Sequence, residues 1–238
     1  RSNANVDKGS TPRRKTAILS ELPGRSFVFR PRHHKIHSLA KRSKGVTMRA
    51  NKIKQMWRDG KASTLGWLSI SHGFTAEMMA RQGFDALCVD LQHGTNEMSD
   101  VGPMLQAISQ TDTVPFVRVA WNDPAPIMRA LDLGAYGIIV PLVNNAEEAA
   151  KAVAACRYPP VGMRSSGPIR AAHYGGAGYQ EAANDEIIVM VMIETKEGIE
   201  NLEAICATPG VDAVYIGPAD LSYALGLAPR GDNPDPLH

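Results

Sequence analysis

Residues 83–120, GFDALCVDLQHGTNEMSDVGPMLQAISQTDTVPFVRVA, contain the pattern that decides the fold. A short apolar run at 86–90 is followed by an amphipathic stretch at 98–110 and by a second apolar run at 115–120. Both runs are apolar at nearly every position, which is typical of strands that are buried on both faces. The segment therefore predicts two parallel strands joined by a helix.

The same alternation of strand-like and helix-like segments extends along the chain in both directions. We expect strands at 64–70, 86–90, 115–120, 137–141, 187–194 and 213–217. We expect helices at about 74–82, 98–110, 124–133, 146–156 and 198–207. Two helix starts carry capping residues, Ser99 and Asp123, and Pro124 follows Asp123 at the first helical position. Apolar strands separated by helices predict a parallel sheet that is covered on both sides.

The order of the elements favours a barrel over a nucleotide-binding sheet. No GxGxxG or P-loop sequence follows the first expected strand, so the phosphate-binding signature of a doubly wound fold is missing there. We therefore predict an α/β fold of the (β/α)8 TIM barrel class. A closed barrel takes about 250 residues and eight units. Because residues 48–238 supply only about six, we expect a barrel that is truncated at its C-terminal end.

The composition excludes several classes of protein. With 44% hydrophobic and 21% charged residues, the chain is an ordinary globular sequence. Its longest apolar run, Ile187–Ile193, is far shorter than the ~20 residues that a membrane-spanning helix needs. The three cysteines have no CxxC spacing, which argues against a secreted disulfide scaffold and against a zinc or redox pair. We therefore expect a cytoplasmic protein with no membrane partner.

Charge divides the chain into two parts at about residue 47. Residues 1–47 contain 12 Lys or Arg and two acidic residues, whereas residues 48–238 contain 14 basic and 22 acidic residues. Three interpretations of this basic leader are open: a nucleic-acid-binding arm, an organellar transit peptide, or sequence upstream of a natural start at Met48. We favour the third, because an amphipathic helix begins directly after Met48. We expect a disordered leader, a barrel domain at 48–238, and no nucleic-acid partner.

Catalytic groups of a barrel lie at the C-terminal ends of its strands. The expected strand at 86–90 ends in Asp90, and His93 follows three residues later. A carboxylate at this spacing can orient an imidazole and raise its basicity, as a general base requires. In the alternative interpretation, Asp90 caps the next turn and His93 is an exposed loop residue.

Two more carboxylates and one arginine lie at the ends of other expected strands. Glu194 ends the strand at 187–194, and Asp220 follows the strand at 213–217. Carboxylates on adjacent strand ends can share a hard divalent cation, with Mg2+, Mn2+ and Co2+ as the candidates. Alternatively, each of them caps the helix that follows it. Arg118 ends an apolar strand and needs either a structural carboxylate or an anionic ligand as its partner.

The GPAD turn at 217–220 adds another kind of group. The backbone N–H groups of Ala219 and Asp220 open a helix, where a small carboxylate can bind. A metal, a base, an arginine and such a turn together favour one reaction class, in which an enolate of a 2-oxo acid forms and is stabilised.

Five segments of the sequence together resemble one enzyme family. They are GFDALCVDLQHG (83–94), PFVRVAWNDP (115–124), ACRYPPVGMRSSGP (155–168), MIETKEGIENL (192–202) and VDAVYIGPADLS (211–222). In this order they resemble the HpcH/HpaI family of metal-dependent class II pyruvate aldolases, which includes 4-hydroxy-2-oxoheptanedioate and 2-dehydro-3-deoxyglucarate aldolases. The resemblance implies a barrel of the phosphoenolpyruvate/pyruvate type. It also implies a carbon–carbon lyase that reversibly cleaves a 4-hydroxy-2-oxo acid into pyruvate and an aldehyde.

The resemblance further implies a role for each candidate residue. His93 is expected to be the general base, oriented by Asp90. Glu194 and Asp220 are expected to bind the divalent cation, which stabilises the pyruvate enolate. Arg118 is expected to stabilise the enolate oxygen and to polarise the aldehyde. The residues expected to contact substrate are Trp67, Arg118, Gly217, Pro218, Ala219 and Asp220.

The sequence departs from the family pattern at two positions near the expected site. Gln92 stands where many members have Glu, and Met192 stands where many have Gln. Neither replaces an expected metal ligand, so we expect an altered preference for the aldehyde rather than weaker metal binding. Arg164 and Arg170 lie in a segment that can shape this preference, and we expect them either to meet a distal carboxylate or to lie on the surface.

Two alternatives to a pyruvate aldolase stay open from the sequence. One is an acyl-CoA lyase of the citrate lyase β or malyl-CoA lyase type, which shares the barrel and the metal. The other is a non-catalytic barrel fragment. For the full-length protein, the resemblance implies small-molecule substrates as partners and a homo-oligomer, either a trimer or a hexamer.

Overall fold

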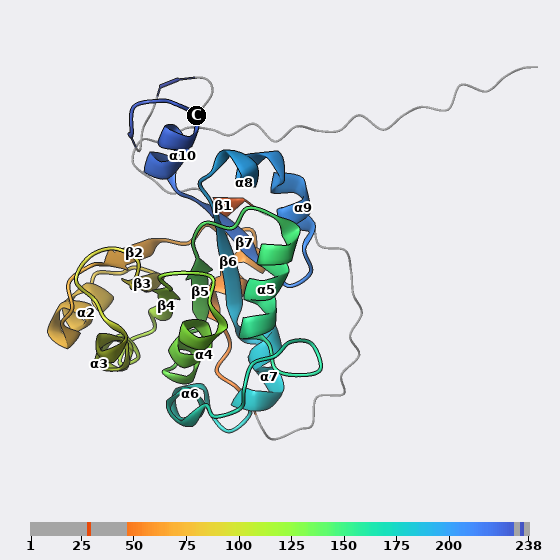
Figure 1. The fold of residues 1–238 in the computed structure, drawn as a ribbon. Coiled ribbons are helices and arrows are strands. Elements are labelled where there is room, and N and C mark those ends of the chain that lie inside the picture. The colour runs from red at the N-terminus through yellow and green to blue at the C-terminus, as the bar shows by residue number, and fades with distance from the viewer. Residues whose placement is uncertain (1–27, 30–46, 231–233, 236–238) are drawn as a thin grey trace, which may run out of the picture.

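In the computed structural model, residues 28–29, 47–230 and 234–235 are described, and they contain one seven-stranded sheet with the order β1-β7-β6-β5-β4-β3-β2 (Figure 1). Six strands are parallel and follow one another in sequence order. These are β2 (Leu65–Leu68), β3 (Ala86–Asp90), β4 (Val114–Arg118), β5 (Gly137–Val140), β6 (Ile188–Ile193) and β7 (Ala213–Ile216). Each parallel strand lies within an expected range or starts one residue before it, so the predicted parallel α/β fold is confirmed.

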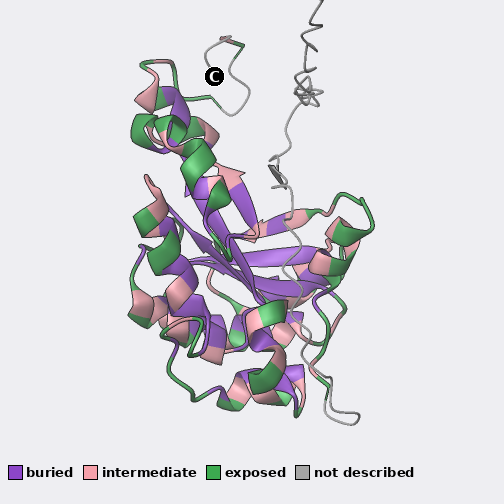
Figure 2. Ribbon diagram, turned by 90° about the vertical axis from the view of Figure 1, so that its right-hand side faces the viewer, coloured by how far each residue is buried: buried purple, intermediate pink, exposed green. Residues whose placement is uncertain are grey.

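Helices connect the strands and cover the outer side of the sheet (Figures 1 and 2). They are α1 (Lys52–Arg58), α2 (Gly73–Ala80), α3 (Met98–Ile108), α4 (Pro124–Asp132), α5 (Ala146–Cys156), α6 (Ile169–Gly175), α7 (Tyr179–Glu186), α8 (Lys196–Glu200), α9 (Leu202–Ala207) and α10 (Pro218–Ala224). Asp123 caps α4 as expected, since its carboxylate accepts a hydrogen bond of 3.0 Å from the N–H of Ala125.

Three helical features differ from the sequence-based expectations. The helix expected at 198–207 is two short helices, α8 and α9, which meet at Asn201. Helices α6 and α7 were not expected. The apolar period of α7 is weak, because the helix buries only Tyr179 and Ala183. Ser99 does not cap α3. That helix begins one residue earlier, and Glu97 is its N-cap in a capping box with Asp100.

The parallel sheet is curled, so that alternate residues of each strand line an inner face. The register places Asp90 beside Arg118 and Met192 beside Tyr215 on this face. The ring of Tyr215 in β7 stacks on that of Trp67 in β2, with 5.4 Å between centroids. Four other parallel strands separate β2 from β7 in the sheet. Side chains of the first and last parallel strands therefore meet across the inner face.

Apolar side chains fill the space between the strands and the helices. The residues of β3, β4, β5 and β6 are all buried, and the exposed residues lie mainly on the outer sides of the helices and in loops (Figure 2). Phe116 fills part of the inner face two residues before Arg118, and it needs a glycine beside it. A Cβ atom at Gly137 would lie 2.1 Å from the Phe116 ring. The inner face is therefore packed on the N-terminal side of Arg118.

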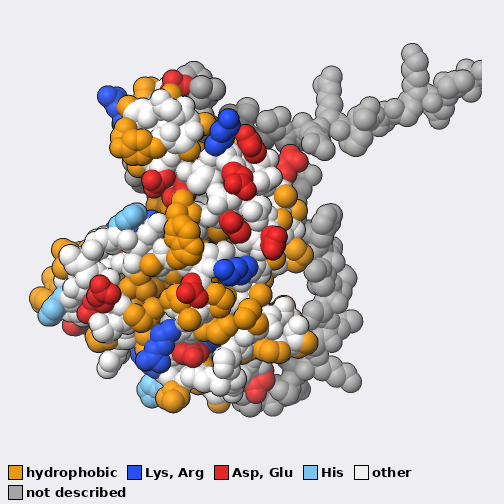
Figure 3. Space-filling view, in the orientation of Figure 1, with side chains coloured by type: hydrophobic (Ala, Val, Ile, Leu, Met, Phe, Trp, Pro, Cys, Tyr) orange, Lys and Arg blue, Asp and Glu red, His pale blue; other side chains and the backbone are white. Residues whose placement is uncertain are grey.

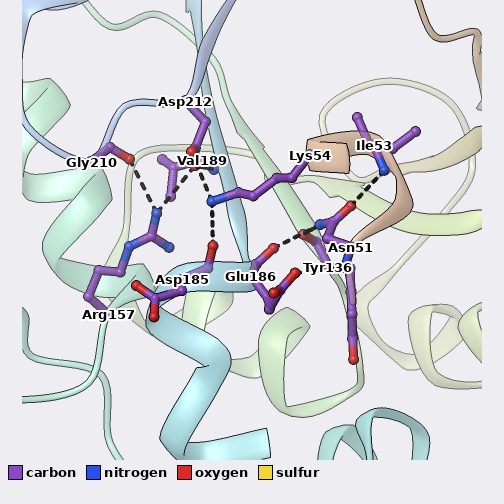
Figure 4. A network of polar contacts seen from close by, with 10 residues as sticks. All are labelled: Asn51, Ile53, Lys54, Tyr136, Arg157, Asp185, Glu186, Val189, Gly210 and Asp212. Carbon is purple, nitrogen blue, oxygen red and sulfur yellow. Dashed lines mark hydrogen bonds and ion pairs between the residues drawn. The ribbon is translucent and has the colours of Figure 1, made fainter. Parts of the chain in front are cut away.

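A polar network fixes α1 at the N-terminal ends of the strands (Figure 4). Lys54 Nζ lies 2.9 Å from Asp212 Oδ1 and donates a hydrogen bond of 2.8 Å to the carbonyl of Asp185. The carboxylate of Asp212 also accepts hydrogen bonds from Arg157 and from the N–H of Val189. Burial lowers the pKa of Lys54, although the charge of Asp212 opposes this shift. The network therefore ties α1 to the beginnings of β6 and β7.

Arg164 and Arg170 lie beside α4, α6 and α7, at the end of the molecule opposite α8 and α10 (Figure 1). The side chain of Arg164 is 0% exposed, and its Nη2 lies 2.9 Å from Asp132 Oδ1. Its Nη1 donates to the hydroxyl of Tyr179 at 3.1 Å. Arg170 is half-buried and donates to the carbonyl of Leu133 at 2.6 Å. Both expectations are wrong for Arg164, because its guanidinium is buried against Asp132, whereas half-buried Arg170 contacts a main-chain carbonyl.

The charge balance of the sequence is visible on one face of the molecule. Acidic side chains gather over α8 and α9 (Figure 3), where Glu197, Glu200 and Glu203 are exposed. Within the ranges that the structure describes, no helix is both long enough and apolar enough to cross a membrane.

The basic leader falls almost wholly outside the described residues. Apart from Thr47, its described part is β1 (Val28–Phe29), which pairs antiparallel with β7 in the register Val28 to Tyr215 and Phe29 to Val214. The predicted boundary at residue 47 and the three interpretations of the leader therefore stay predictions.

The buried pair of Arg164 and Asp132 predicts a large effect on stability. Replacing Asp132 with Ala leaves the Arg164 charge buried without its carboxylate, and we expect the free energy of unfolding to fall by about 3 kcal/mol. Glu77→Ala is the control, because it breaks the exposed pair with Arg81 and should lower stability by less than about 0.5 kcal/mol. Urea unfolding measures both, and equal losses would contradict the prediction.

Candidate active site

The structure brings the candidate residues together at the C-terminal ends of the parallel strands. Asp90 and Arg118 are the last residues of β3 and β4, and Glu194 directly follows β6. Gly217 directly follows β7 and is the N-cap of α10, so Asp220 lies in the first turn of that helix. Since side chains alternate along a strand, Asp90, Arg118 and Glu194 share the inner face with Trp67 and Tyr215.

Asp90 and Arg118 form a bidentate ion pair. Arg118 Nε donates to Asp90 Oδ1 at 2.8 Å, and Arg118 Nη2 donates to Asp90 Oδ2 at 2.6 Å. The side chains of Asp90 and Arg118 are 1% and 9% exposed. Each buried charge therefore requires the opposite charge of the other. Burial alone would raise the pKa of Asp90, but the hydrogen bonds from Arg118 and Trp67 outweigh it and keep that pKa below its usual value. Asp90 is therefore a carboxylate, and the partner that Arg118 needs is a structural one.

Trp67 supports this pair from β2. Its indole N–H donates to Asp90 Oδ2 at 2.9 Å, and the Arg118 guanidinium lies over its ring at 4.8 Å. The other ring neighbour of Trp67 is Tyr215. Trp67 is half-buried, so it both packs in the fold and borders the site.

His93 is exposed in the turn that follows β3. The contact that joins it to Asp90 runs through the main chain, since the N–H of His93 donates to Asp90 Oδ1 at 3.2 Å. The N–H of Gln92 donates to the same oxygen at 3.0 Å. The structure thus shows the capping contact that was the alternative interpretation of Asp90. The role of His93 as a base stays a prediction.

Glu194 is the buried carboxylate of the site, with 2% exposure. Its Oε1 accepts a hydrogen bond of 2.7 Å from the N–H of Leu142. Burial raises the pKa of Glu194, the Leu142 N–H opposes this, and the nearby charge of Asp220 raises the pKa further. The positive charge of Arg118 lowers it, and an interaction with His93 acts in the same direction. All four candidate groups are therefore close enough to interact electrostatically.

The helix after β6 does not use Glu194 as its cap. The Thr195 hydroxyl accepts from the N–H of Gly198 at 2.9 Å and caps α8. Asp220 lies in the first turn of α10 without capping it. The capping alternative is therefore wrong for both carboxylates.

The donor set fits a hard divalent cation. Burial and the nearby charge of Asp220 raise the pKa of Glu194, and a cation bound by the two carboxylates would favour their charged forms. Across the described part of the chain, His, Cys, Asp and Glu side chains form no cluster of three or more. A cation held by Glu194 and Asp220 would take its other ligands from water and substrate oxygens, as Mg2+ commonly does.

Sequence reasoning missed two contributors to this site. Tyr215 lies two residues before Gly217 on β7, so the two-residue period could have placed it on the inner face. Leu142 contributes only its backbone N–H, and residue type gives no signal for such a donor.

Gly217 is predicted to be required for the position of Glu194. A Cβ atom at residue 217 would lie 2.4 Å from Glu194 Oε2, so Gly217→Ala must displace that carboxylate. We expect Mn2+ affinity, measured by calorimetric titration, to fall by at least about tenfold. Gly102→Ala is the control, because its Cβ would lie 3.6 Å from Leu133 without a clash. Unchanged Mn2+ affinity in Gly217→Ala would contradict the prediction.

Comparison with known proteins gives matches over the same part of the chain. A family model described as HpcH/HpaI aldolase/citrate lyase matches residues 64–237. The hydroxypyruvate/pyruvate aldolase of Rhizorhabdus wittichii is 42% identical over 182 residues, which are 76% of this chain and 72% of that protein. The 4-hydroxy-2-oxo-heptane-1,7-dioate aldolase of Shigella flexneri is 42% identical over 188 residues, 78% of this chain and 70% of that protein.

A solved structure shares the fold. The crystal structure of an HpcH/HpaI aldolase/citrate lyase family protein from Burkholderia cenocepacia J2315 is 38% identical, with a TM-score of 0.72, and the match covers 78% of this chain and 76% of that one. The family match at 64–237 includes all six parallel strands and every candidate residue from Trp67 to Asp220. The five sequence segments and these matches agree, and the chain belongs to the HpcH/HpaI aldolase/citrate lyase family of enzymes.

Proposed function

We propose that this enzyme is a divalent-metal-dependent aldolase that reversibly cleaves a 4-hydroxy-2-oxo acid into pyruvate and an aldehyde. The observation that carries the proposal is that Asp90, Arg118 and buried Glu194 end neighbouring parts of the sheet at its C-terminal edge, with the start of the Asp220 helix against Glu194 Oε2. The names of the two aldolases at 42% identity support the same reaction class. We further propose that the six parallel strands are units of a (β/α)8 barrel of the phosphoenolpyruvate/pyruvate type.

Glu194 and Asp220 are the proposed ligands of the cation, with Mg2+, Mn2+ or Co2+ as candidates. When bound, such a cation supplies Lewis-acid stabilisation of the negative charge that develops on the substrate oxygens. The first-turn N–H groups of Ala219 and Asp220 have no acceptor inside their helix, so they are proposed to meet the carboxylate of the 2-oxo acid, beside Gly217 and Pro218.

His93 is proposed to move the proton during cleavage. Its exposed ring takes the proton of the 4-hydroxyl group, the C3–C4 bond breaks, and the electron pair of that bond enters the pyruvate enolate. The C4 carbon leaves as the aldehyde, and return of a proton to C3 gives pyruvate. Asp90 supports this step by fixing the turn that carries His93, through the hydrogen bond to the His93 N–H.

Arg118 is proposed to stabilise the enolate oxygen. Its Nε and Nη2 are held by Asp90, which fixes the plane of the guanidinium. The remaining nitrogen, Nη1, lies 3.8 Å from Met192 Sδ, and a thioether is a weak acceptor. Arg118 therefore keeps one donor nitrogen for a stronger acceptor such as an enolate or aldehyde oxygen.

Exchange of the pyruvate methyl protons tests the proposal without knowledge of the aldehyde. We expect the enzyme in D2O to exchange these protons in the presence of Mg2+ or Co2+ and to stop when EDTA removes the metal. Proton NMR follows the exchange, and circular dichroism of the same sample reports folding. A folded sample that shows no metal-dependent exchange would contradict the proposed function.

Replacing His93 with Ala tests the assignment of the base. Loss of a positioned general base typically slows a reaction by about 10²–10⁴-fold, and we expect a fall in the exchange rate within that range. Mn2+ affinity should change little, because His93 is not a proposed ligand. His72→Asn is the matched control, since His72 is an exposed histidine that caps α2 through Nδ1, and Asn preserves the cap. Equal exchange rates in the two variants would refute the role of His93.

A further inference from the structure

The loop after β5 contains an unusual backbone conformation next to the site. Among the described residues other than glycine, Leu142 alone has a positive φ, at 54°. This left-handed region is unfavourable for a bulky side chain and persists only where the surroundings hold it. The contacts of Leu142 therefore have to hold this conformation.

The consequence is the hydrogen bond to Glu194. In this conformation the Leu142 N–H donates to Glu194 Oε1 at 2.7 Å, although 52 residues separate the two in sequence. The second oxygen, Oε2, lies against Gly217 at the start of α10. The two carboxylate oxygens of Glu194 therefore have different neighbours. One is held by the main chain of the β5–α5 loop, and the other lies at the helix that carries Asp220.

The side chain of Asn144 contacts the main chain of Leu142. Its amide donates to the carbonyl of Leu142 at 3.1 Å. Asn144 is itself held by other elements. Its N–H donates to Glu148 Oε2 at 2.8 Å, its carbonyl accepts from Asn201 at 2.9 Å, and its side-chain oxygen accepts from the Thr195 hydroxyl.

We infer that Asn144 is a positioning residue, which holds Leu142 in its left-handed conformation so that the Leu142 N–H fixes Glu194 for cation binding. This inference rests on the proposed function, because it takes Glu194 as a metal ligand. A carboxylate whose orientation is fixed in advance loses less freedom when it binds a cation, and residues behind a ligand typically contribute 10–100-fold to metal affinity. Asn144 thereby acts on the metal site without touching the cation.

Asn144→Ala tests the inference through metal affinity. The variant loses the hydrogen bond from the Asn144 side chain to the Leu142 carbonyl. We therefore expect the Kd for Mn2+ to rise by about tenfold. Electron paramagnetic resonance of free Mn2+ measures this in the absence of substrate. Circular dichroism in EDTA verifies the fold. Asn145→Ala is the matched control, because Asn145 caps α5 through the N–H of Glu148 and does not contact Leu142, so its Mn2+ Kd should stay within about twofold of the wild-type value.

A rescue variant separates positioning from general loss of packing. Glycine adopts positive φ without strain, so Leu142→Gly added to Asn144→Ala should recover part of the lost Mn2+ affinity. A merely structural role for Asn144 predicts no recovery, because Leu142→Gly removes another side chain. Should Asn144→Ala fail to fold, Glu148→Gln takes its place. It weakens the bond to the Asn144 N–H, and we expect a rise in Kd of about threefold.

The outcomes distinguish the inference from the proposed function. Wild-type protein that binds no Mn2+ overturns the proposed metal site and this inference with it. Wild-type protein that binds Mn2+, together with a folded Asn144→Ala that binds it equally well, overturns the inference alone. Loss of affinity in Asn144→Ala, with recovery in the double variant, supports it.

Discussion

The ion pair between Asp90 and Arg118 is the interaction on which the site depends. It joins the ends of neighbouring strands, and both side chains are almost fully buried, so neither charge is tolerable alone. The same carboxylate also accepts from the Trp67 indole and from the N–H of His93. One buried group therefore sets the plane of a guanidinium, the orientation of an aromatic ring and the path of the turn that carries an exposed imidazole.

This arrangement gives a physical meaning to the methionine at position 192. Two nitrogens of Arg118 donate to Asp90, and one face of its guanidinium lies on the Trp67 ring. The direction of the remaining nitrogen, Nη1, is therefore fixed. A glutamine at position 192 would offer an amide oxygen, which is a strong acceptor, to the same nitrogen. The thioether of Met192 is a weak one. The thioether at position 192 therefore leaves Nη1 more available to another acceptor atom than an amide oxygen there would.

The sequence predicted where Asp90, Arg118 and Glu194 lie in the fold better than it predicted their contacts. Asp90, Arg118 and Glu194 each end an apolar run, and the barrel rule places such residues at one edge. The partner of Asp90 could not be derived in this way, because the pairing with Arg118 comes from the register of β3 and β4, which local sequence does not determine. The contact of the Leu142 N–H could not be predicted from the sequence for another reason. Its position depends on a backbone angle rather than on a side chain.

The two ends of the sheet differ in the surroundings of their buried charged groups. At the N-terminal end, buried charges have partners of opposite sign, as in the pairs of Lys54 with Asp212 and of Arg164 with Asp132. At the C-terminal end, Glu194 is buried with its carboxylate near that of Asp220, and both burial and that neighbour raise its pKa. Burial of this kind disfavours the charged form of a carboxyl group, and groups with shifted pKa values gather at functional sites. Glu194 therefore lies at the end of the sheet where the cation is proposed to bind, and the pair of Asp90 with Arg118 stabilises that same end.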